Sequence, residues 1–156
     1  MASLIGLYSL FFGLCSSFLI IFFSIKNFRN FLNFDSKILS LTFLQFFFVV
    51  VSFLGLVISF INSDFSNETV YNHSHTTKPL FYKISGTWGN HEGSLLLWLL
   101  VLTLFLFLFL LKSKDQNKKY RILTLFFQQI IIIGFFIYLL KTSNPFSYIF
   151  PTPAEG

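Results

Sequence analysis

Four uncharged apolar runs restrict what this 156-residue chain can fold into more than any other feature of its sequence. They cover residues 4–25, 38–61, 94–111 and 122–140, and none contains Asp, Glu, Lys or Arg. Roughly 20 helical residues cross the ~30 Å hydrocarbon core of a bilayer, so each run can span it. Backbone groups in lipid must find partners within the protein, and the runs lack the alternation of barrel strands. We therefore predict an all-α integral membrane protein with four transmembrane helices, a long loop at 62–93 and a single membrane domain over residues 1–156.

The composition agrees with this fold class, because 54% of the residues are hydrophobic and only 11% are charged. Soluble domains usually carry about a quarter charged residues. The dominance of Phe, Ile, Leu, Asn and Lys is typical of AT-rich genes, which indicates an organelle or a reduced bacterial genome. Cys15 is the only cysteine and lies within an apolar run, so an internal disulfide is excluded. The first run is too long for a signal-peptide core and no basic segment precedes it, so no cleavable signal is predicted.

The basic residues are concentrated in two short connections, residues 26–37 and 112–121, which hold eight of the eleven Lys and Arg. The positive-inside rule predicts that these connections face the cytoplasm or the mitochondrial matrix. The amino terminus, loop 62–93 and the tail 141–156 then face the periplasm or the intermembrane space. Because the cations lie between apolar runs and form no basic face with exposed aromatic residues, we predict a partner in membrane lipid and none in nucleic acid.

Three glutamines, Gln45, Gln128 and Gln129, are the polar side chains that stand out within the apolar runs. In lipid we expect them to face other helices and to form hydrogen bonds there. No carboxylate, His, Lys or Arg lies in the middle of a run, although ion and proton pathways usually need one. This argues against a four-helix transporter or respiratory-chain subunit, which stays as an alternative.

The loop contains His73-x-His75, a pair that can face one side of an extended segment. Zinc usually takes at least three protein ligands, and no thiolate or carboxylate adjoins this pair, so no metal site is predicted. His91-Glu92 begins like a zinc-protease helix motif, but Leu95 stands where the second histidine is required.

Two triplets of the loop, residues 67–69 and 72–74, match the N-glycosylation sequon. Such triplets arise by chance in loops that are rich in Asn and Ser. In an organellar or bacterial protein they would carry no glycan, and this is the interpretation that we favour.

The densest chemistry lies just before the third apolar run, where Trp88, His91, Glu92 and Trp98 adjoin small turn-forming residues. One interpretation is an interfacial anchor, with Trp rings at headgroup depth and a glutamate favoured by the dipole at a helix N-terminus. The other is a surface for an apolar ligand that bears carboxylates, such as haem, with Trp for stacking and His as a nitrogen ligand. These four residues are our candidates for a haem or partner surface, and no catalytic residue is predicted.

Three separated blocks of the sequence match one family in order. The upstream block consists of Asn62-Ser63-Asp64-Phe65-Ser66, Tyr71, Ser74 and residues 79–87. The central block is Trp88-Gly89-x-His91-Glu92-Gly93-Ser94-Leu95-Leu96-Leu97-Trp98. The downstream block consists of Thr142-Ser143-Asn144-Pro145-Phe146 and Pro151-x-Pro153-x-Glu155-Gly156. With four spans between them, the chain resembles CcmF, the large subunit of the cytochrome c haem lyase in the bacterial-type (system I) maturation pathway.

The resemblance implies a role in haem delivery to apocytochrome c and in covalent haem attachment. It extends over this chain but only over the amino-terminal third or less of the family. The Trp-rich segment and the membrane histidines that ligate haem b in the family lie beyond residue 156, so none of those ligands is assigned here. We expect a fragment or a natural split form, not catalytic alone, in the mitochondrial inner membrane, or in the bacterial one if the source is prokaryotic.

The partners that the resemblance implies are the remaining CcmF part, the haem chaperone CcmE, a CcmH-type thiol-handling subunit and apocytochrome c. A non-catalytic scaffold module of the same complex is an alternative role for the chain.

Overall fold

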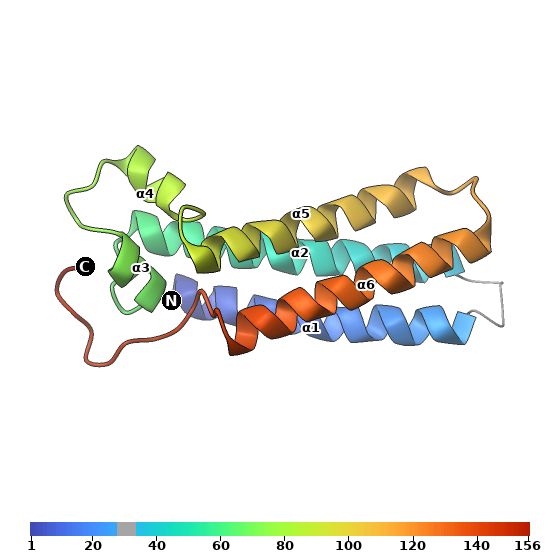
Figure 1. Ribbon diagram of the computed structural model, residues 1–156, viewed down its shortest axis with the longest axis horizontal. Helices are drawn as coiled ribbons and strands as arrows, with labels where there is room; N and C mark the ends of the chain where they lie inside the picture. The colour runs from blue at the N-terminus through green and yellow to red at the C-terminus, as the bar shows by residue number, and fades with distance from the viewer. Residues whose placement is uncertain (28–33) are drawn as a thin grey trace.

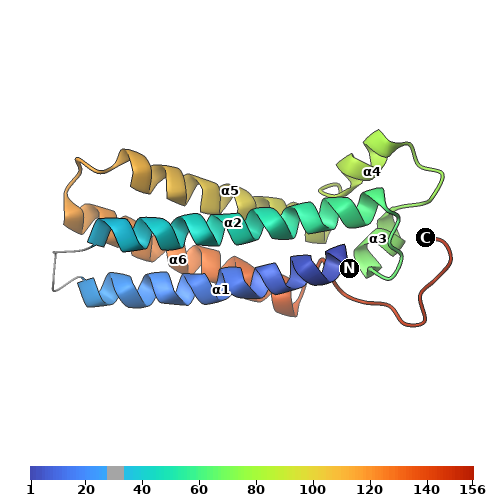
Figure 2. The same ribbon diagram turned by 180° about the vertical axis from the view of Figure 1, so that it is seen from behind.

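A computed structural model describes residues 1–27 and 34–156, and four long helices run side by side along its length (Figures 1 and 2). They are α1 (Ala2–Asn27), α2 (Phe34–Ile61), α5 (His91–Lys112) and α6 (Lys118–Lys141). All four are long and apolar enough to cross a membrane, so the predicted fold class is confirmed. Each extends a few residues beyond its apolar run, because polar residues at the ends continue the helix into the headgroup region.

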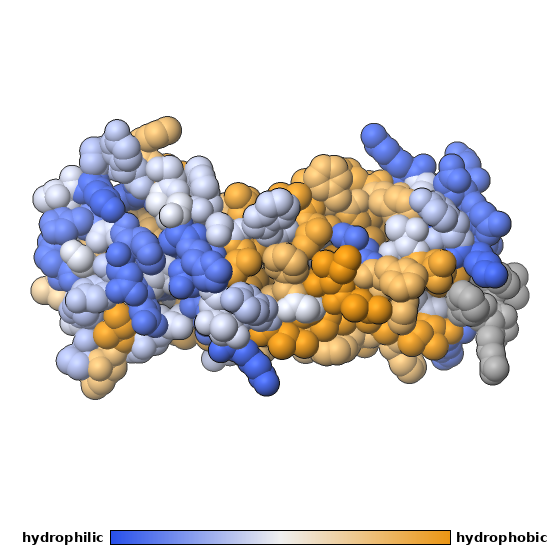
Figure 3. Space-filling view, viewed as in Figure 1, coloured by the Kyte–Doolittle hydropathy of each residue, from blue (hydrophilic) through white to orange (hydrophobic). Residues whose placement is uncertain are grey.

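The four helices form a bundle in which α1 packs on α2 and α6, and α5 packs on α2 and α6. Its interior is filled by aliphatic and aromatic side chains from all four helices, among them Leu10, Leu56, Leu99, Ile132 and Phe136. Many large apolar side chains point outward instead. Figure 3 shows them gathered over the middle of the molecule, with hydrophilic residues at the two ends. A bundle with an apolar belt outside its core is suited to lipid.

Helices α1 and α2 approach closely where Gly55 faces Gly6. A Cβ atom built on Gly55 would lie 3.0 Å from the carbonyl oxygen of Ala2 and 3.1 Å from the Cα of Gly6. Small residues at such a crossing let two backbones meet, which is how helices commonly associate in membranes.

A polar contact in the middle of the bundle joins three helices. The Gln129 amide donates to Gln45 Oε1 at 2.8 Å, and the Gln45 amide donates to Gln129 Oε1 at 3.2 Å and to Ser17 Oγ at 2.6 Å. Gln45 and Gln129 are fully buried, as predicted. Gln128, which directly precedes Gln129 on α6, is only half-buried, because its side chain points away from the pair.

The connection between α2 and α5 contains two short helices, α3 (Glu68–His73) and α4 (Leu80–Gly86). Helix α5 begins at His91, three residues before the apolar run, so His91 and Glu92 lie in its first turn and not in the loop. Both chain termini lie beside α3 and α4 (Figure 1), and we call this end of the bundle the loop end. The opposite end, with the α5–α6 connection, is called the basic end.

At the basic end, Arg121 is buried, with 3% of its surface exposed. Its Nε donates to Ser113 Oγ at 3.1 Å, and its Nη2 donates to the Leu110 carbonyl at 3.2 Å. The guanidinium therefore caps the C-terminus of α5, where a cation also complements the helix dipole. This cation of the 112–121 connection has a structural role besides any role as a topology signal.

Candidate functional site

The three sequence blocks that we singled out meet at the loop end. Asn67, which directly follows Ser66 of the upstream block, is 1% exposed and joins two segments of the loop end. Its Oδ1 accepts from the backbone N–H groups of Thr69 and Val70 and caps α3, while its Nδ2 donates to the Pro145 carbonyl at 2.9 Å. Since the side-chain amide is buried and occupied, Asn67 cannot serve as a glycan acceptor in this fold. This agrees with our interpretation of that sequon as a chance match.

The third block folds back over the start of α1. The backbone N–H of Glu68 donates to Ser147, and that of Ile149 donates to Ser66, so the segment pairs with the loop. Phe146 is 5% exposed and its ring fills the space beside Gly6, where a Cβ would lie 2.4 Å from ring carbons. The segment after α6 therefore pairs with the loop and packs over this end of the bundle.

The turn between α4 and α5 explains two residues of the central block, Asn90 and Gly93. Asn90 caps α5, because its Oδ1 accepts from the backbone N–H of Gly93 at 2.6 Å and its Nδ2 donates to the Gly86 carbonyl at 2.8 Å. A Cβ on Gly93 would lie 1.6 Å from the Thr87 carbonyl oxygen, so only glycine fits there. These residues set the direction in which α5 leaves the turn.

Three of our four candidates point outward from this turn. Trp88, His91 and Trp98 are exposed, with 42% of Trp88 and 61% of Trp98 accessible. Positions 91 and 98 are two helical turns apart on α5 and share a face. The His91 ring meets the ring of Tyr138 on α6 edge to face, with centroids 6.4 Å apart. The structure therefore adds Tyr138, which sequence analysis missed.

Below this aromatic pair lies an apolar groove of about 340 Å³ between α5 and α6, lined by Leu95, Ile131, Gly134, Phe135 and Tyr138. Leu95 is one turn below His91 on the same face of α5. Nothing lies within 4 Å of a Cβ built on Gly134, so this glycine leaves the groove wall open. A glycine inside a helical run is the one sequence signal that could have pointed to this groove.

Glu92 does not join the other candidates. Its side chain lines a different pocket of about 170 Å³, with polar residues of α3 and of the segment after α6: Glu68, Thr69, Asn72, His73, Thr142, Ser143, Asn144 and Ser147. Glu92 Oε2 and Ser143 Oγ are buried and have no hydrogen-bond partner among the described residues. Glu92 therefore points to a different part of the surface from the other three candidates, because position 92 is rotated by about 100° from position 91 on the helix.

Comparison with known proteins identifies relatives of this chain, although no protein-family model matches it. The cytochrome c-type biogenesis protein CycK of Bradyrhizobium diazoefficiens is 45% identical over 112 residues, which are 72% of this chain and 17% of that protein. CcmF of Escherichia coli is 37% identical over 114 residues, 72% of this chain and 18% of that protein. The solved structure of the cytochrome c haem lyase CcmF matches with a TM-score of 0.84 and 28% identity, over 94% of this chain. The chain belongs to the CcmF family.

The chain spans about one sixth of the length of the curated CcmF relatives that it matches and 25% of the solved CcmF chain. The structural match extends over all but a few of its residues, so the four helices and the loop end together reproduce part of the CcmF fold. The sequence blocks that carried the resemblance are the ones that build the loop end of this CcmF segment.

The three histidines of this chain lie in different surroundings. Among residues 1–27 and 34–156, no three His, Cys, Asp or Glu side chains are grouped to hold a metal ion. His73 Nδ1 lies 3.0 Å from the Thr69 carbonyl, and His75 lies 3.7 Å from Glu155 in the exposed tail contact. His91 is at the end of a span.

Proposed function

We propose that this chain is the amino-terminal part of a CcmF-type haem lyase, which assists the delivery of haem and its covalent attachment to apocytochrome c. The relatives and the solved structure that it matches carry the names of cytochrome c biogenesis and of haem lyase, which supports this assignment. The reaction joins haem to the cysteine thiols of apocytochrome c. This chain's own contribution is to bind and orient.

The observation that carries a local role is the groove under the His91–Tyr138 pair. Binding sites for flat apolar molecules are concave and mainly apolar, with a few polar groups at the mouth. The groove offers an apolar wall of about 340 Å³, with an imidazole and a phenol at the top and Trp98 on the same face of α5. This arrangement is suited to one edge of a porphyrin, with haem as the substrate.

The polar pocket of Glu92 has the opposite character. Haem propionates are negatively charged, and Glu68 and Glu92 both line this pocket, so like charges would repel them. We assign the haem-facing surface to Trp88, His91, Trp98 and Tyr138, and leave Glu92 outside it.

The complex in which the chain acts comprises the remaining CcmF part with its haem b ligands, the haem chaperone CcmE, a CcmH-type subunit and apocytochrome c. The dominance of Phe, Ile, Leu, Asn and Lys, which is typical of AT-rich genes, favours a mitochondrially encoded split form in the inner membrane. The concentration of basic residues at one end favours an orientation with the loop end in the intermembrane space, or in the periplasm of a bacterium.

The test introduces substitutions at the groove into the gene in its own cell and measures c-type cytochromes by covalent haem staining. Gly134→Leu places a side chain into the open groove and is expected to reduce cytochrome c maturation several-fold. Gly134→Ala adds only a methyl group and should retain it. His91→Ala should lower maturation, whereas His73→Ala, in the α3 region, should not.

Normal maturation in both Gly134→Leu and His91→Ala, with normal amounts of the protein, would refute the haem-facing role of the groove. It would favour the alternative in which the chain is a scaffold for its partners. The scaffold alternative draws support from Gly93 of the motif and from Asn90 and Asn67 near it, because the fold itself uses these residues.

A further inference from the structure

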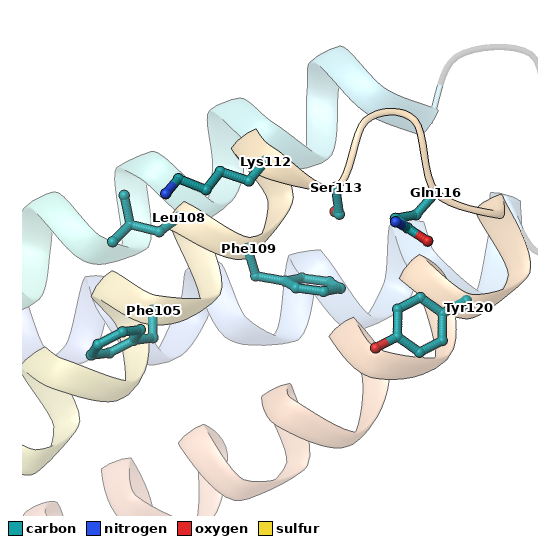
Figure 4. Close-up of a pocket in the computed structure, with 7 residues that line it drawn as sticks. All are labelled: Phe105, Leu108, Phe109, Lys112, Ser113, Gln116 and Tyr120. Atoms are coloured by element: carbon teal, nitrogen blue, oxygen red, sulfur yellow. The ribbon is translucent and has the colours of Figure 1, made fainter.

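A third pocket of about 520 Å³ lies at the basic end, between the last turns of α5 and the first turn of α6. Its lining is divided by chemistry: Phe105, Leu108 and Phe109 form an apolar wall, and Lys112, Ser113, Gln116 and Tyr120 supply polar groups toward the end of the bundle. Figure 4 shows Phe109 and Tyr120 pointing into the space between the two helices, with Gln116 on the connecting turn. The proposed function makes no use of this pocket.

The apolar wall is exposed on the surface of the bundle. Phe105 is 63% exposed and Leu108 is 36% exposed, while Phe109 packs edge to face on Tyr120 with ring centroids 6.2 Å apart. Exposed aromatic and aliphatic side chains along a membrane span meet acyl chains. Tyr120 belongs to the class of residues that are common at headgroup depth.

The polar part of the pocket can bind an anion. Lys112 ends α5, and no carboxylate lies within ion-pair distance of it in the described parts of the chain. The Gln116 amide and the Tyr120 hydroxyl line the same pocket and can also donate hydrogen bonds. The 112–121 connection has five basic residues and one acidic residue, Asp115, so the potential around the pocket is positive.

We propose that this pocket binds an anionic phospholipid, with the phosphate at Lys112, Gln116 and Tyr120 and an acyl chain along Phe105 and Leu108. A ligand must be anionic at one end and apolar at the other to match both parts of the lining, and a membrane supplies such molecules at this depth. Basic pockets between transmembrane helices bind the headgroups of anionic lipids in this way. The positive charge that orients the protein thus also selects a lipid.

The test is native mass spectrometry of the purified chain in detergent micelles, with phosphatidylglycerol and phosphatidylcholine of identical acyl chains. We expect retention of phosphatidylglycerol in preference to phosphatidylcholine. Lys112→Gln should weaken its binding about fivefold, the effect of removing one charge near a membrane surface. Lys114→Gln removes the same charge from the same connection but outside the pocket, and should change binding little.

Equal binding of the two lipids would overturn the proposal and would leave a helix of a protein partner as the occupant. Equal losses in Lys112→Gln and Lys114→Gln would also overturn it, since they would indicate diffuse attraction without a site. A headgroup without acyl chains, glycerophosphoglycerol, should not compete. Competition at equal concentration would show a phosphate site in place of a lipid site. Both lysines are exposed, so neither substitution threatens the fold.

Discussion

The contact between Gln45 and Gln129 shows how buried polar side chains can join the helices of a membrane bundle. The two amides exchange two hydrogen bonds, and Gln45 adds a third to Ser17, so α1, α2 and α6 share one polar cluster. Sequence analysis could predict that these glutamines face inward, because lipid offers them no partner. It could not predict which two of the three would pair, since this depends on the rotation of α6.

Replacing one member of this pair should destabilise the bundle. Gln45→Leu leaves the Gln129 amide buried without its partner, and we expect a loss of about 1–2 kcal/mol in the free energy of unfolding. The measurement is reversible unfolding in mixed micelles. Gln128→Leu on the neighbouring position should cost less, because Gln128 is half-buried and outside the pair. Equal losses for Gln45→Leu and Gln128→Leu would contradict the importance of the pair.

The contact between Glu155 and the loop gives a residue-scale prediction for pH. The hydrogen bond that Thr76 Oγ1 donates to Glu155 at 2.6 Å lowers the pKa of this carboxyl, and His75 lowers it further. Because the pKa of Glu155 is lower in the folded state, its ionised carboxylate stabilises the docked tail at pH values above the ordinary carboxyl pKa. This stabilisation is lost as the pH falls through the lowered pKa.

Removal of the Thr76 hydroxyl should therefore raise the pKa of Glu155 toward the ordinary value, which a carbon-13 NMR titration of the carboxyl group would measure. His75→Ala should raise it by less, because its charge is a smaller cause. An unchanged pKa in Thr76→Val would contradict the assignment of the hydrogen bond as the main cause.

At the scale of elements, helix length and type follow from the sequence, but the packing of helices depends on where small residues fall. Gly55 and Gly134 are both glycines in apolar runs, and nothing in their local sequence distinguishes their roles. In the fold, Gly55 meets the backbone of α1, whereas Gly134 faces open space. Gly134 alone could therefore not identify the groove that we propose for haem, because the groove is defined by a gap between two helices.

The two glycines should respond oppositely to the same substitution. Gly55→Ala brings a methyl group to 3.0–3.3 Å from backbone atoms that cannot rotate away, and should destabilise the bundle by about 1–3 kcal/mol. Gly134→Ala should be neutral, or should stabilise α6 by up to about 1 kcal/mol, because alanine is the better helix former. Thermal unfolding in detergent would compare them. A loss in Gly134→Ala equal to that in Gly55→Ala would contradict the described packing.

At the scale of the whole molecule, the sequence blocks that carry the resemblance to CcmF are the ones that build the loop end. The blocks at 62–74, 79–98 and 142–156 are separated by spans in the sequence, yet they form one structure that contains both termini. Sequence analysis predicted their common side from the charge of the connections. It treated the loop as one surface, and it missed that Glu92 turns into a polar pocket while His91 turns toward α6.

The orientation of the molecule is the prediction on which the haem-facing role depends, since the groove must open near the side where apocytochrome c is matured. In a Cys15→Ser background, we expect Thr77→Cys, at the exposed loop end, to react with a membrane-impermeant maleimide from the periplasmic or intermembrane-space side. Lys114→Cys, at the exposed basic end, should react only after the membrane is opened, because eight of the eleven basic residues hold that end on the inner side. Inverted vesicles serve as the control and should exchange the two results. The opposite labelling pattern would place the His91–Tyr138 groove on the wrong side of the membrane and would refute its role in haem attachment.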